Sequence, residues 1–458
     1  MSADLVIKNG WVVTPERTFK GGVAIVDGKI ASVGPDDTLP GGKQELDTKG
    51  KHILPGIIDG HVHFREPGLT HKEDFGSGSS AAVCGGVVMV VDMPNTVPPV
   101  TGPDQVLEKQ RLAEEKSLVD FGITGVIIGS NLPQIMPMAR AGALGFKIFF
   151  GETTGNLPCP DDGLCTEIFP MVTDSKLPLS IHAESREIMA YHMARLKAEG
   201  KNDPIFWESS RPEICETASV ARALFFAETF GTRLHILHMS SKQATRMVRD
   251  AKARGVRVTA ETTPHHLLRD SREMEKFGPL LKINPPVRSS DHGEALWKGL
   301  LDGTVDMIAT DHSPHTLEEK GSDPFGKLLK PTIWDCISGF CGVETGPSLI
   351  LTEVNKGRMT LNQYVKLAAE NPARVWQIYP QKGALRPGSD GDVTIVDMDR
   401  ETVIDSSRLH SKTKPSPWHG WKVKGVPVGT VVRGHIQMLD GEVTGKPIGR
   451  LVRPAPVG

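Results

Sequence analysis

Residues 85–95, GGVVMVVDMPN, are a short apolar run that ends in polar residues. An unbroken run of this length is typical of a parallel strand buried on both faces. Similar runs follow at residues 120–128, 143–150, 177–184, 234–241, 257–267 and 305–315. Helix-forming stretches such as PDQVLEKQRLAEEK, residues 103–116, separate them. This α/β alternation predicts a (β/α)8 barrel (TIM barrel), with a doubly wound open sheet as the alternative.

The two ends of the chain have a different pattern. Residues 1–55 contain β-branched runs broken by Asn-Gly and Asp-Gly turns, and residues 376–458 repeat that pattern. Chain termini commonly lie near each other. We therefore expect residues 56–375 to form the barrel and the two end segments to form one smaller β-sandwich domain.

Composition excludes several classes of partner. The 458 residues include 53 Lys and Arg against 55 Asp and Glu, so nothing favours a nucleic acid or an anionic membrane, and a small-molecule substrate is expected. No run approaches the roughly 20 apolar residues of a membrane span, and the start MSADLVIKNG lacks the layout of a secretory signal, which predicts a cytoplasmic protein. The six scattered cysteines form no C-x-x-C pair, which favours reduced thiols over disulfides, a thiolate metal site or a catalytic cysteine.

Potential metal ligands follow the apolar runs. In IIDGHVHFREPG, residues 57–68, His61 and His63 would share one face of an extended strand and could bind one ion, although an isolated H-x-H is equally often two polar residues at a strand end. His182, His238 and Asp311 each close another strand. Strand ends converge at the mouth of a barrel, and imidazoles with a carboxylate suit zinc or a similar divalent ion.

Lys147 lies within the apolar run GFKIFF, where burial of a charged amine is costly. The lysine could simply reach the barrel rim. The functional interpretation is that its amine has reacted with carbon dioxide, so that the carbamate (N6-carboxylysine) bridges two ions. His61, His63 and Asp311 would then bind one ion, and His182 and His238 the other. Two ions roughly 3.5–4 Å apart supply hydroxide for attack on an amide, and Asp311 could transfer the proton to the leaving nitrogen.

The chain resembles the amidohydrolase superfamily, and within it the cyclic amidohydrolases: dihydroorotase, allantoinase and dihydropyrimidinase (hydantoinase). The resemblance covers nearly the whole length and rests on PGIIDGHVHFREPG, MPNT, GFKIFFG, HAE, HILHMSS, TPHHL, KINPPVR, TDHSPHTLEEK, NPARV and GSDGDVTIVD. It implies the same six ligand positions, the lysine carbamate, two divalent ions (zinc expected), the β-sandwich built from both ends, and a homo-oligomer, either a dimer or a tetramer.

Dihydroorotase is the favoured member, with reversible interconversion of L-dihydroorotate and N-carbamoyl-L-aspartate as the expected reaction. By resemblance, Arg65, Asn95 and His315 would hold the substrate carboxylate, and an arginine fork suits a carboxylate. Asn284 would meet the pyrimidine edge, although an Asn-Pro turn is an equally good interpretation. The segment that contains Thr153 and Thr154 resembles a loop that closes over the substrate. His265 and His266 are expected to be structural or to support the ligands.

Two alternatives stay open. Allantoin, a hydantoin or another cyclic ureide or imide would be hydrolysed by the same chemistry. The tyrosine that dihydropyrimidinases usually carry shortly after the lysine is not found here, since Phe149 and Phe150 follow, and this disfavours a hydantoinase. A non-catalytic scaffold would be expected to have lost ligands, whereas all six positions are retained.

Overall fold

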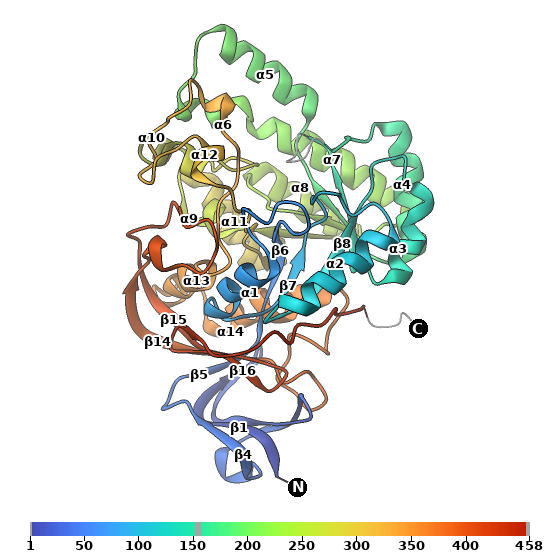
Figure 1. Ribbon diagram of the computed structural model, residues 1–458. Coiled ribbons are helices and arrows are strands. Elements are labelled where there is room, and N and C mark those ends of the chain that lie inside the picture. The colour runs from blue at the N-terminus through green and yellow to red at the C-terminus, as the bar shows by residue number, and fades with distance from the viewer. Residues whose placement is uncertain (1, 152–156, 455–458) are drawn as a thin grey trace.

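Eight parallel strands form the centre of the protein (Figure 1). The structure, a computed structural model, describes residues 2–151 and 157–454. Each strand pairs with the next along the chain, in the order β13-β12-β11-β10-β9-β8-β7-β6. The strands are β6 (Ile57–Val62), β7 (Val87–Asp92), β8 (Asp120–Val126), β9 (Gly145–Phe149), β10 (Leu179–His182), β11 (Leu234–Ile236), β12 (Val258–Thr262) and β13 (Met307–Ile308).

The sheet closes into a barrel. Val62 of β6 forms a parallel bridge with His312, beyond the end of β13, and the His63 amide donates to the His312 carbonyl over 2.7 Å. These contacts join the first strand to the last, so the structure is a (β/α)8 barrel and not a doubly wound open sheet.

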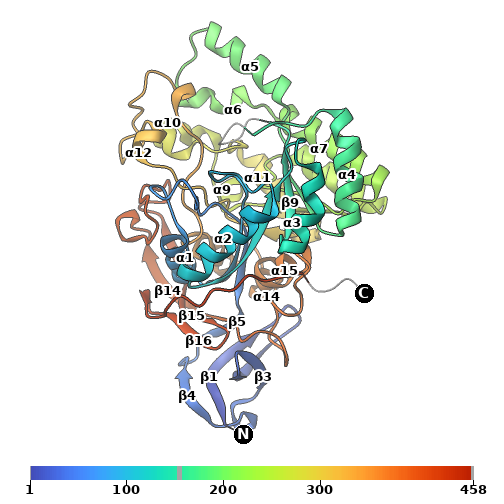
Figure 2. The ribbon, with the colours of Figure 1, turned by 45° about the vertical axis from the view of Figure 1, so that its right-hand side comes forward.

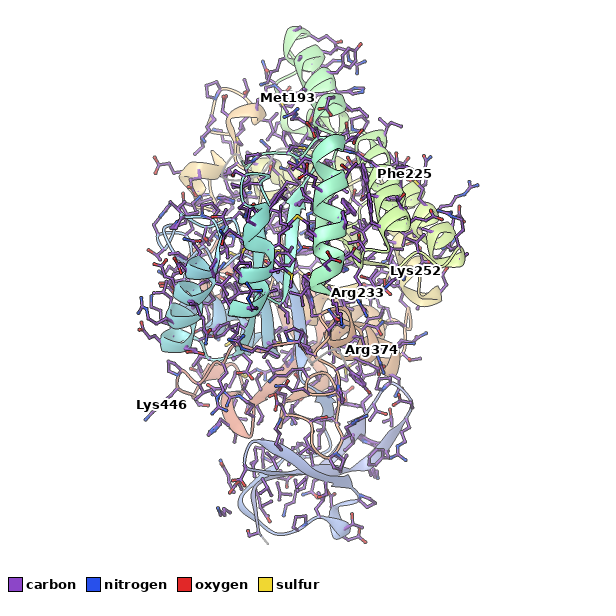
Figure 3. All side chains as sticks on the ribbon, turned by 90° about the vertical axis from the view of Figure 1, so that its right-hand side faces the viewer. Met193, Phe225, Arg233, Lys252, Arg374 and Lys446 are labelled. Atoms are coloured by element: carbon purple, nitrogen blue, oxygen red, sulfur yellow. The ribbon has the colours of Figure 1, made fainter. Side chains whose placement is uncertain are left out.

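Helices surround the barrel, and Figure 3 shows Phe225 of α7 and Lys252 of α8 on their outer side. Among the described residues no helix is long and apolar enough to cross a membrane. The helices are α1 (Phe75–Cys84), α2 (Pro103–Lys116), α3 (Ile135–Ala141), α4 (Asp162–Ser175), α5 (Arg186–Ala198), α6 (Trp207–Ser210), α7 (Glu213–Phe230), α8 (Lys242–Ala253), α9 (Pro264–Leu268), α10 (Met274–Phe277), α11 (Ser290–Asp302), α12 (Leu317–Lys320), α13 (Gly346–Asn355), α14 (Leu361–Val365) and α15 (Asn371–Val375).

Both ends of the chain build one nine-stranded sheet below the barrel (Figure 2). Strand β5 pairs antiparallel with β14 and so joins the N-terminal strands to the C-terminal ones. The fold is thus a barrel with a smaller β-sandwich from both termini, as predicted. The exact domain limits, 55/56 and 375/376, remain a prediction. The strands are β1 (Ala3–Val13), β2 (Thr18–Val26), β3 (Lys29–Gly34), β4 (Gly42–Asp47), β5 (His52–Pro55), β14 (Val393–Val403), β15 (Lys422–Val432), β16 (His435–Leu439) and β17 (Glu442–Val443).

A buried ion cluster links the sandwich to the barrel. Lys382 is fully buried, and its Nζ contacts three carboxylates: Asp120 at the start of β8, and Asp390 and Asp392 just before β14. The distances to Asp392 Oδ2 and Asp390 Oδ2 are 2.6 and 3.0 Å. Because a buried charge is costly without partners, this cluster fixes how the C-terminal segment meets the barrel.

Candidate active site

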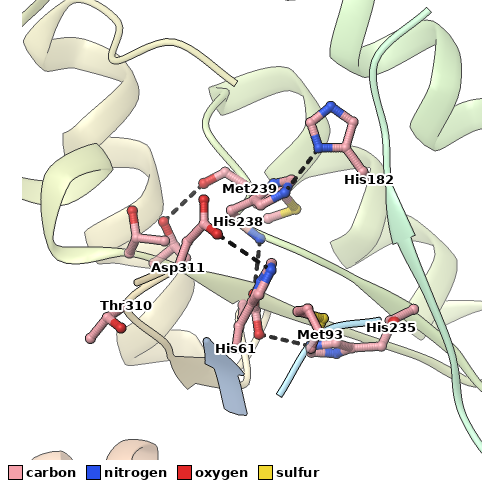
Figure 4. Close-up of polar contacts among 12 residues, drawn as sticks. His61, Met93, His182, His235, His238, Met239, Thr310 and Asp311 are labelled. Carbon is pink, nitrogen blue, oxygen red and sulfur yellow. Dashed lines mark hydrogen bonds and ion pairs between the residues drawn. The ribbon is translucent and has the colours of Figure 1, made fainter. Parts of the chain in front are cut away.

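Six predicted ligand residues meet at the carboxyl ends of the barrel strands, and Figure 4 shows four of them, His61, His182, His238 and Asp311. All six are buried, and their side chains contact one another in one region. The strands place them there because His61 lies in β6 and Lys147 in β9, and His182 ends β10. His63 directly follows β6, and His238 and Asp311 lie two and three residues beyond the ends of β11 and β13. The complete set is His61, His63, Lys147, His182, His238 and Asp311.

His61, His63 and Asp311 form the first group. Asp311 Oδ1 lies 3.4 Å from His61 Nε2 and 3.3 Å from His63 Nε2. Their ligand atoms all lie within 4.8 Å of one another. Two imidazole nitrogens and one carboxylate oxygen are a suitable donor set for a divalent ion.

His182 and His238 form the second group, with Lys147 near the first. His182 Nδ1 and His238 Nε2 lie 3.1 Å apart, and Lys147 Nζ donates to His61 Nε2 over 3.2 Å. His238 Nδ1 is buried and has no hydrogen-bond partner in the part of the chain that the structure describes. The converging nitrogen and oxygen donors of both groups therefore fit a pair of cations.

Two buried glutamates orient the imidazoles, and the sequence prediction assigned them no role. His61 Nδ1 lies 2.6 Å from Glu261 Oε1, and His182 Nε2 lies 2.9 Å from Glu184 Oε2. Because an ionised carboxylate only accepts, each imidazole donates its proton outward and turns its other nitrogen toward the centre. The sequence contained a signal for one of these two glutamates. Glu184 lies two residues after His182 at a strand end, and side chains at that spacing share one face.

The electrostatics keep the imidazoles neutral. Burial, reinforced by the Lys147 charge, lowers the pKa of His61 to about 4, and burial holds the pKa of His63 and His238 well below the usual value. Burial raises the pKa of Glu261, but His61 and His235 outweigh it and bring that pKa to about 2. Neutral imidazoles are the protonation state that metal binding requires, whereas burial raises the pKa of the ligand carboxylate Asp311 to about 8, so this residue would release its proton when a cation binds.

The backbone is strained at three site residues. Arg65, His238 and Asp311 have φ values of 63°, 33° and 48°, in the left-handed region that side chains seldom adopt. Such conformations persist where the surrounding structure imposes them and often occur at functional sites. Here each one lies two or three residues after the end of a barrel strand, and its side chain lies at the barrel mouth.

A cavity opens over the two groups. Three predicted substrate contacts, Arg65, Asn95 and Asn284, line it beside the ligand residues, together with Phe149, Ile283, Ser313 and Ser338. Arg65 Nη1, Asn95 Oδ1 and Asn284 Oδ1 are buried without a hydrogen-bond partner among residues 2–151 and 157–454. These polar atoms are therefore available to a bound molecule. No sequence pattern indicated Ser338 or Ile283 as site residues.

His315 lies behind Arg65 and does not line this cavity. Its Nε2 accepts from Arg65 Nη2 over 3.0 Å, and Arg65 Nε donates to the Pro314 carbonyl over 3.2 Å. Glu319, which binds Lys72 over 2.7 Å, lies 3.5 Å from His315 Nδ1. In this structure His315 therefore holds the arginine in place.

The remaining sequence predictions concern two pairs of residues. His266 Nδ1 lies 2.9 Å from Thr263 Oγ1, its Nε2 lies 3.0 Å from the Pro285 carbonyl, and the His265 ring packs on Phe340. Neither histidine lines the cavity, which agrees with a structural role. Thr153 and Thr154 lie outside the described residues.

Comparison with known proteins places this arrangement in a family. The model of the amidohydrolase family matches residues 52–437. The chain belongs to the amidohydrolase family. A dihydroorotase of Methanothermobacter thermautotrophicus is 37% identical over 443 residues, covering 96% of this chain and 95% of the relative. An allantoinase of Deinococcus radiodurans is 35% identical over 457 residues, covering 99% of each chain.

A solved structure of this amidohydrolase family agrees with the fold. The L-hydantoinase (dihydropyrimidinase) from Arthrobacter aurescens superposes with a TM-score of 0.94 at 34% identity, covering 98% of this chain and 99% of its own. This amidohydrolase is thus a hydrolase acting on C–N bonds of cyclic amides. Dihydroorotase, allantoinase and hydantoinase relatives are about equally similar, so similarity alone does not select the substrate.

Proposed function

We propose that the protein is a dihydroorotase, which reversibly interconverts L-dihydroorotate and N-carbamoyl-L-aspartate. We further propose that it uses two divalent ions, with zinc preferred, and carries Lys147 as N6-carboxylysine. A cytoplasmic location and a homo-oligomeric state remain predictions.

The observation that supports this substrate is the buried Arg65 at the cavity. The residue is 2% exposed, and its guanidinium bonds to the Pro314 carbonyl and His315, with no carboxylate within ion-pair distance among the described residues. Burial lowers its pKa only to about 10, so the guanidinium is charged at neutral pH. A buried cation with a free N–H at the cavity favours an anionic substrate, and the ring carboxylate of dihydroorotate would supply the missing partner.

The ligand residues have defined roles in the proposed reaction. His61, His63 and Asp311 would hold one ion and His182 and His238 the other, with the Lys147 carbamate between them. When bound, the ions would supply hydroxide near neutral pH and polarise the substrate carbonyl. Asp311 would collect the proton and pass it to the ring nitrogen as the C–N bond breaks, which leaves a carboxylate and a ureido N–H.

The environment of Lys147 favours the carbamate. Burial lowers the pKa of this amine to about 8, although Asp311 and Glu261 oppose the effect. Near neutral pH a fraction of the amine is therefore uncharged and can attack carbon dioxide, with release of one proton. The anionic product would suit a buried position between two cations better than an ammonium group.

A substrate panel tests the proposed function. We expect activity on L-dihydroorotate, and Arg65→Ala should raise KM for it about 10- to 100-fold, because hydrogen bonds to charged groups contribute about 1.5–3 kcal/mol. Arg65→Lys keeps the positive charge but loses the two parallel N–H donors of the guanidinium. Its KM should therefore lie between the KM of the unmodified protein and that of Arg65→Ala. Activity confined to allantoin or hydantoin would contradict the proposal, as would an equal KM effect on all substrates.

A hydantoinase is the second candidate, since the L-hydantoinase structure superposes closely on this chain. Phe149, which lines the cavity next to Lys147 and His182, provides an apolar surface for a ring substituent. Under this alternative Arg65→Ala would leave KM for the hydantoin unchanged.

A further inference from the structure

A second cluster of potential ligands lies away from the barrel mouth. Cys84, Glu344 and His410 each offer a ligand atom, and these atoms lie within 4.8 Å of one another. The three side chains line a surface hollow that shares no residue with the active-site cavity. They are half-buried, so solvent can reach them.

Glu344 fixes the orientation of His410. The His410 amide donates to Glu344 Oε2 over 2.8 Å, and His410 Nδ1 lies 3.0 Å from Glu344 Oε1. Because the carboxylate accepts, the ring proton is on Nδ1 and the lone pair is on Nε2. This carboxylate–histidine pair has the same arrangement as Glu261 with His61 and Glu184 with His182 in the active site.

His410 Nε2, the ring nitrogen that Glu344 does not contact, faces the Cys84 thiol and forms a hydrogen bond with it. The distance from Nε2 to Cys84 Sγ is 3.7 Å, and the Gly441 carbonyl oxygen also lies 3.7 Å from that sulfur. A sulfur at ~2.3 Å and a nitrogen at ~2.0 Å from one tetrahedral zinc ion lie about 3.5 Å apart. The two side chains therefore have the spacing of ligands to a common ion.

The alternative interpretation, a nucleophilic cysteine with a histidine base, is disfavoured. Burial, with Glu344 and Glu442, raises the pKa of the Cys84 thiol, so it stays protonated and unreactive. The same two glutamates would attract a cation. Cysteine sulfur with imidazole nitrogen favours a thiophilic divalent ion over magnesium or calcium.

We propose that Cys84 and His410 bind a thiophilic divalent cation such as Zn²⁺, with Glu344 as the carboxylate that orients His410. When the sulfur–metal bond forms, the Cys84 thiol releases one proton to solvent, and water completes the coordination. The ion would join the end of α1 to the segment between β14 and β15, and so connect the barrel to the sandwich.

Cobalt absorption tests this site without reference to the substrate. The purified protein, with its barrel-mouth site loaded, is titrated with Co²⁺ while near-ultraviolet absorption is recorded. The predicted barrel-mouth ligands are all nitrogen or oxygen, so a sulfur-to-cobalt charge-transfer band reports on a cysteine site alone. We expect the band to saturate at one equivalent in the unmodified protein.

Variants identify the ligands. The band should vanish in Cys84→Ser and in His410→Gln, which retains the thiol, and should persist in Cys159→Ser, where the other half-buried thiol is replaced. Glu344→Gln should weaken Co²⁺ affinity about 10- to 100-fold without abolishing the band. Cys84→Ser should keep normal kcat, and circular dichroism checks that it folds. If Cys84→Ser does not fold, the presence or absence of the band in His410→Gln decides the test.

Two results would overturn the site. One is the absence of a band in the folded, unmodified protein. The other is a band that survives in Cys84→Ser and His410→Gln but disappears in Cys341→Ser. That pattern would assign the sulfur to the buried cluster of Cys341 with Glu73 and His312.

Discussion

Replacement of Glu261 by glutamine should weaken metal binding although Glu261 is not a predicted ligand. Its Oε1 lies 2.6 Å from His61 Nδ1 and 3.3 Å from the His238 amide nitrogen, and its Oε2 lies 3.1 Å from His235 Nε2. Glutamine keeps the shape but removes the charge that holds the His61 proton on Nδ1. The ligand nitrogen, His61 Nε2, should then be less basic and less well oriented.

The size of this effect follows from the contacts. Hydrogen bonds to charged groups contribute about 1.5–3 kcal/mol, which corresponds to about 10- to 100-fold in affinity. Loss of such carboxylate partners elsewhere costs a similar factor in metal affinity or activity. We therefore expect the dissociation constant of the metal in Glu261→Gln to rise by about 10- to 100-fold, measured by competition with a chelator at neutral pH.

Glu216→Gln provides a matched control. Glu216 is also a buried glutamate, but it accepts hydrogen bonds from the Ser240 amide and hydroxyl, at 2.8 and 2.7 Å, and contacts no predicted ligand. It should keep the metal affinity of the unmodified protein. Equal affinity in Glu261→Gln and the unmodified protein, or an equal loss in both variants, would refute the role of Glu261.

Two further predictions concern stability. Burial alone would raise the pKa of Glu184, but Arg211, His182 and Arg288 together outweigh it and lower that pKa from 4.5 to about 2. Glu184 therefore stabilises the fold above pH ~4.5 by about 3 kcal/mol, and this contribution is lost as the pH falls toward 2. Urea unfolding of metal-free protein at pH 7 and pH 3 should show this loss, and a Glu184→Gln variant with the same pH dependence would contradict it. Lys382→Met should lower the free energy of unfolding by about 3–5 kcal/mol at pH 7, because the buried Asp392 loses its cation and Asp120 and Asp390 keep only Arg433 and Lys29. A change below about 1 kcal/mol in urea titrations would show that the cluster is dispensable.

The barrel and the ligand set could be predicted because both follow from order along the chain. Unbroken apolar runs identify strands buried on both faces, and a polar residue directly after such a run must lie at the barrel mouth. That reasoning placed His61, His182 and Asp311 at the barrel mouth from the sequence alone. It needs only the strand period and the direction of the chain.

Contacts between distant segments could not be predicted in the same way. Glu261 reaches His61 across 200 residues, and His315 supports Arg65 across 250. The cluster of Cys84 and His410 spans 326 residues, while the sequence spacing of the cysteines disfavoured a thiolate site. Such pairs depend on side-chain direction and loop path, which local periodicity does not determine.

An anomalous-difference electron-density map from a crystal of the protein, recorded at the zinc absorption edge, tests the central claim most directly. We predict two peaks in the barrel mouth, one beside His61, His63 and Asp311 and one beside His182 and His238, with density beyond Lys147 Nζ that joins them. A map with no anomalous peak among these residues, or with an unmodified Lys147 amine directed away from them, would contradict it.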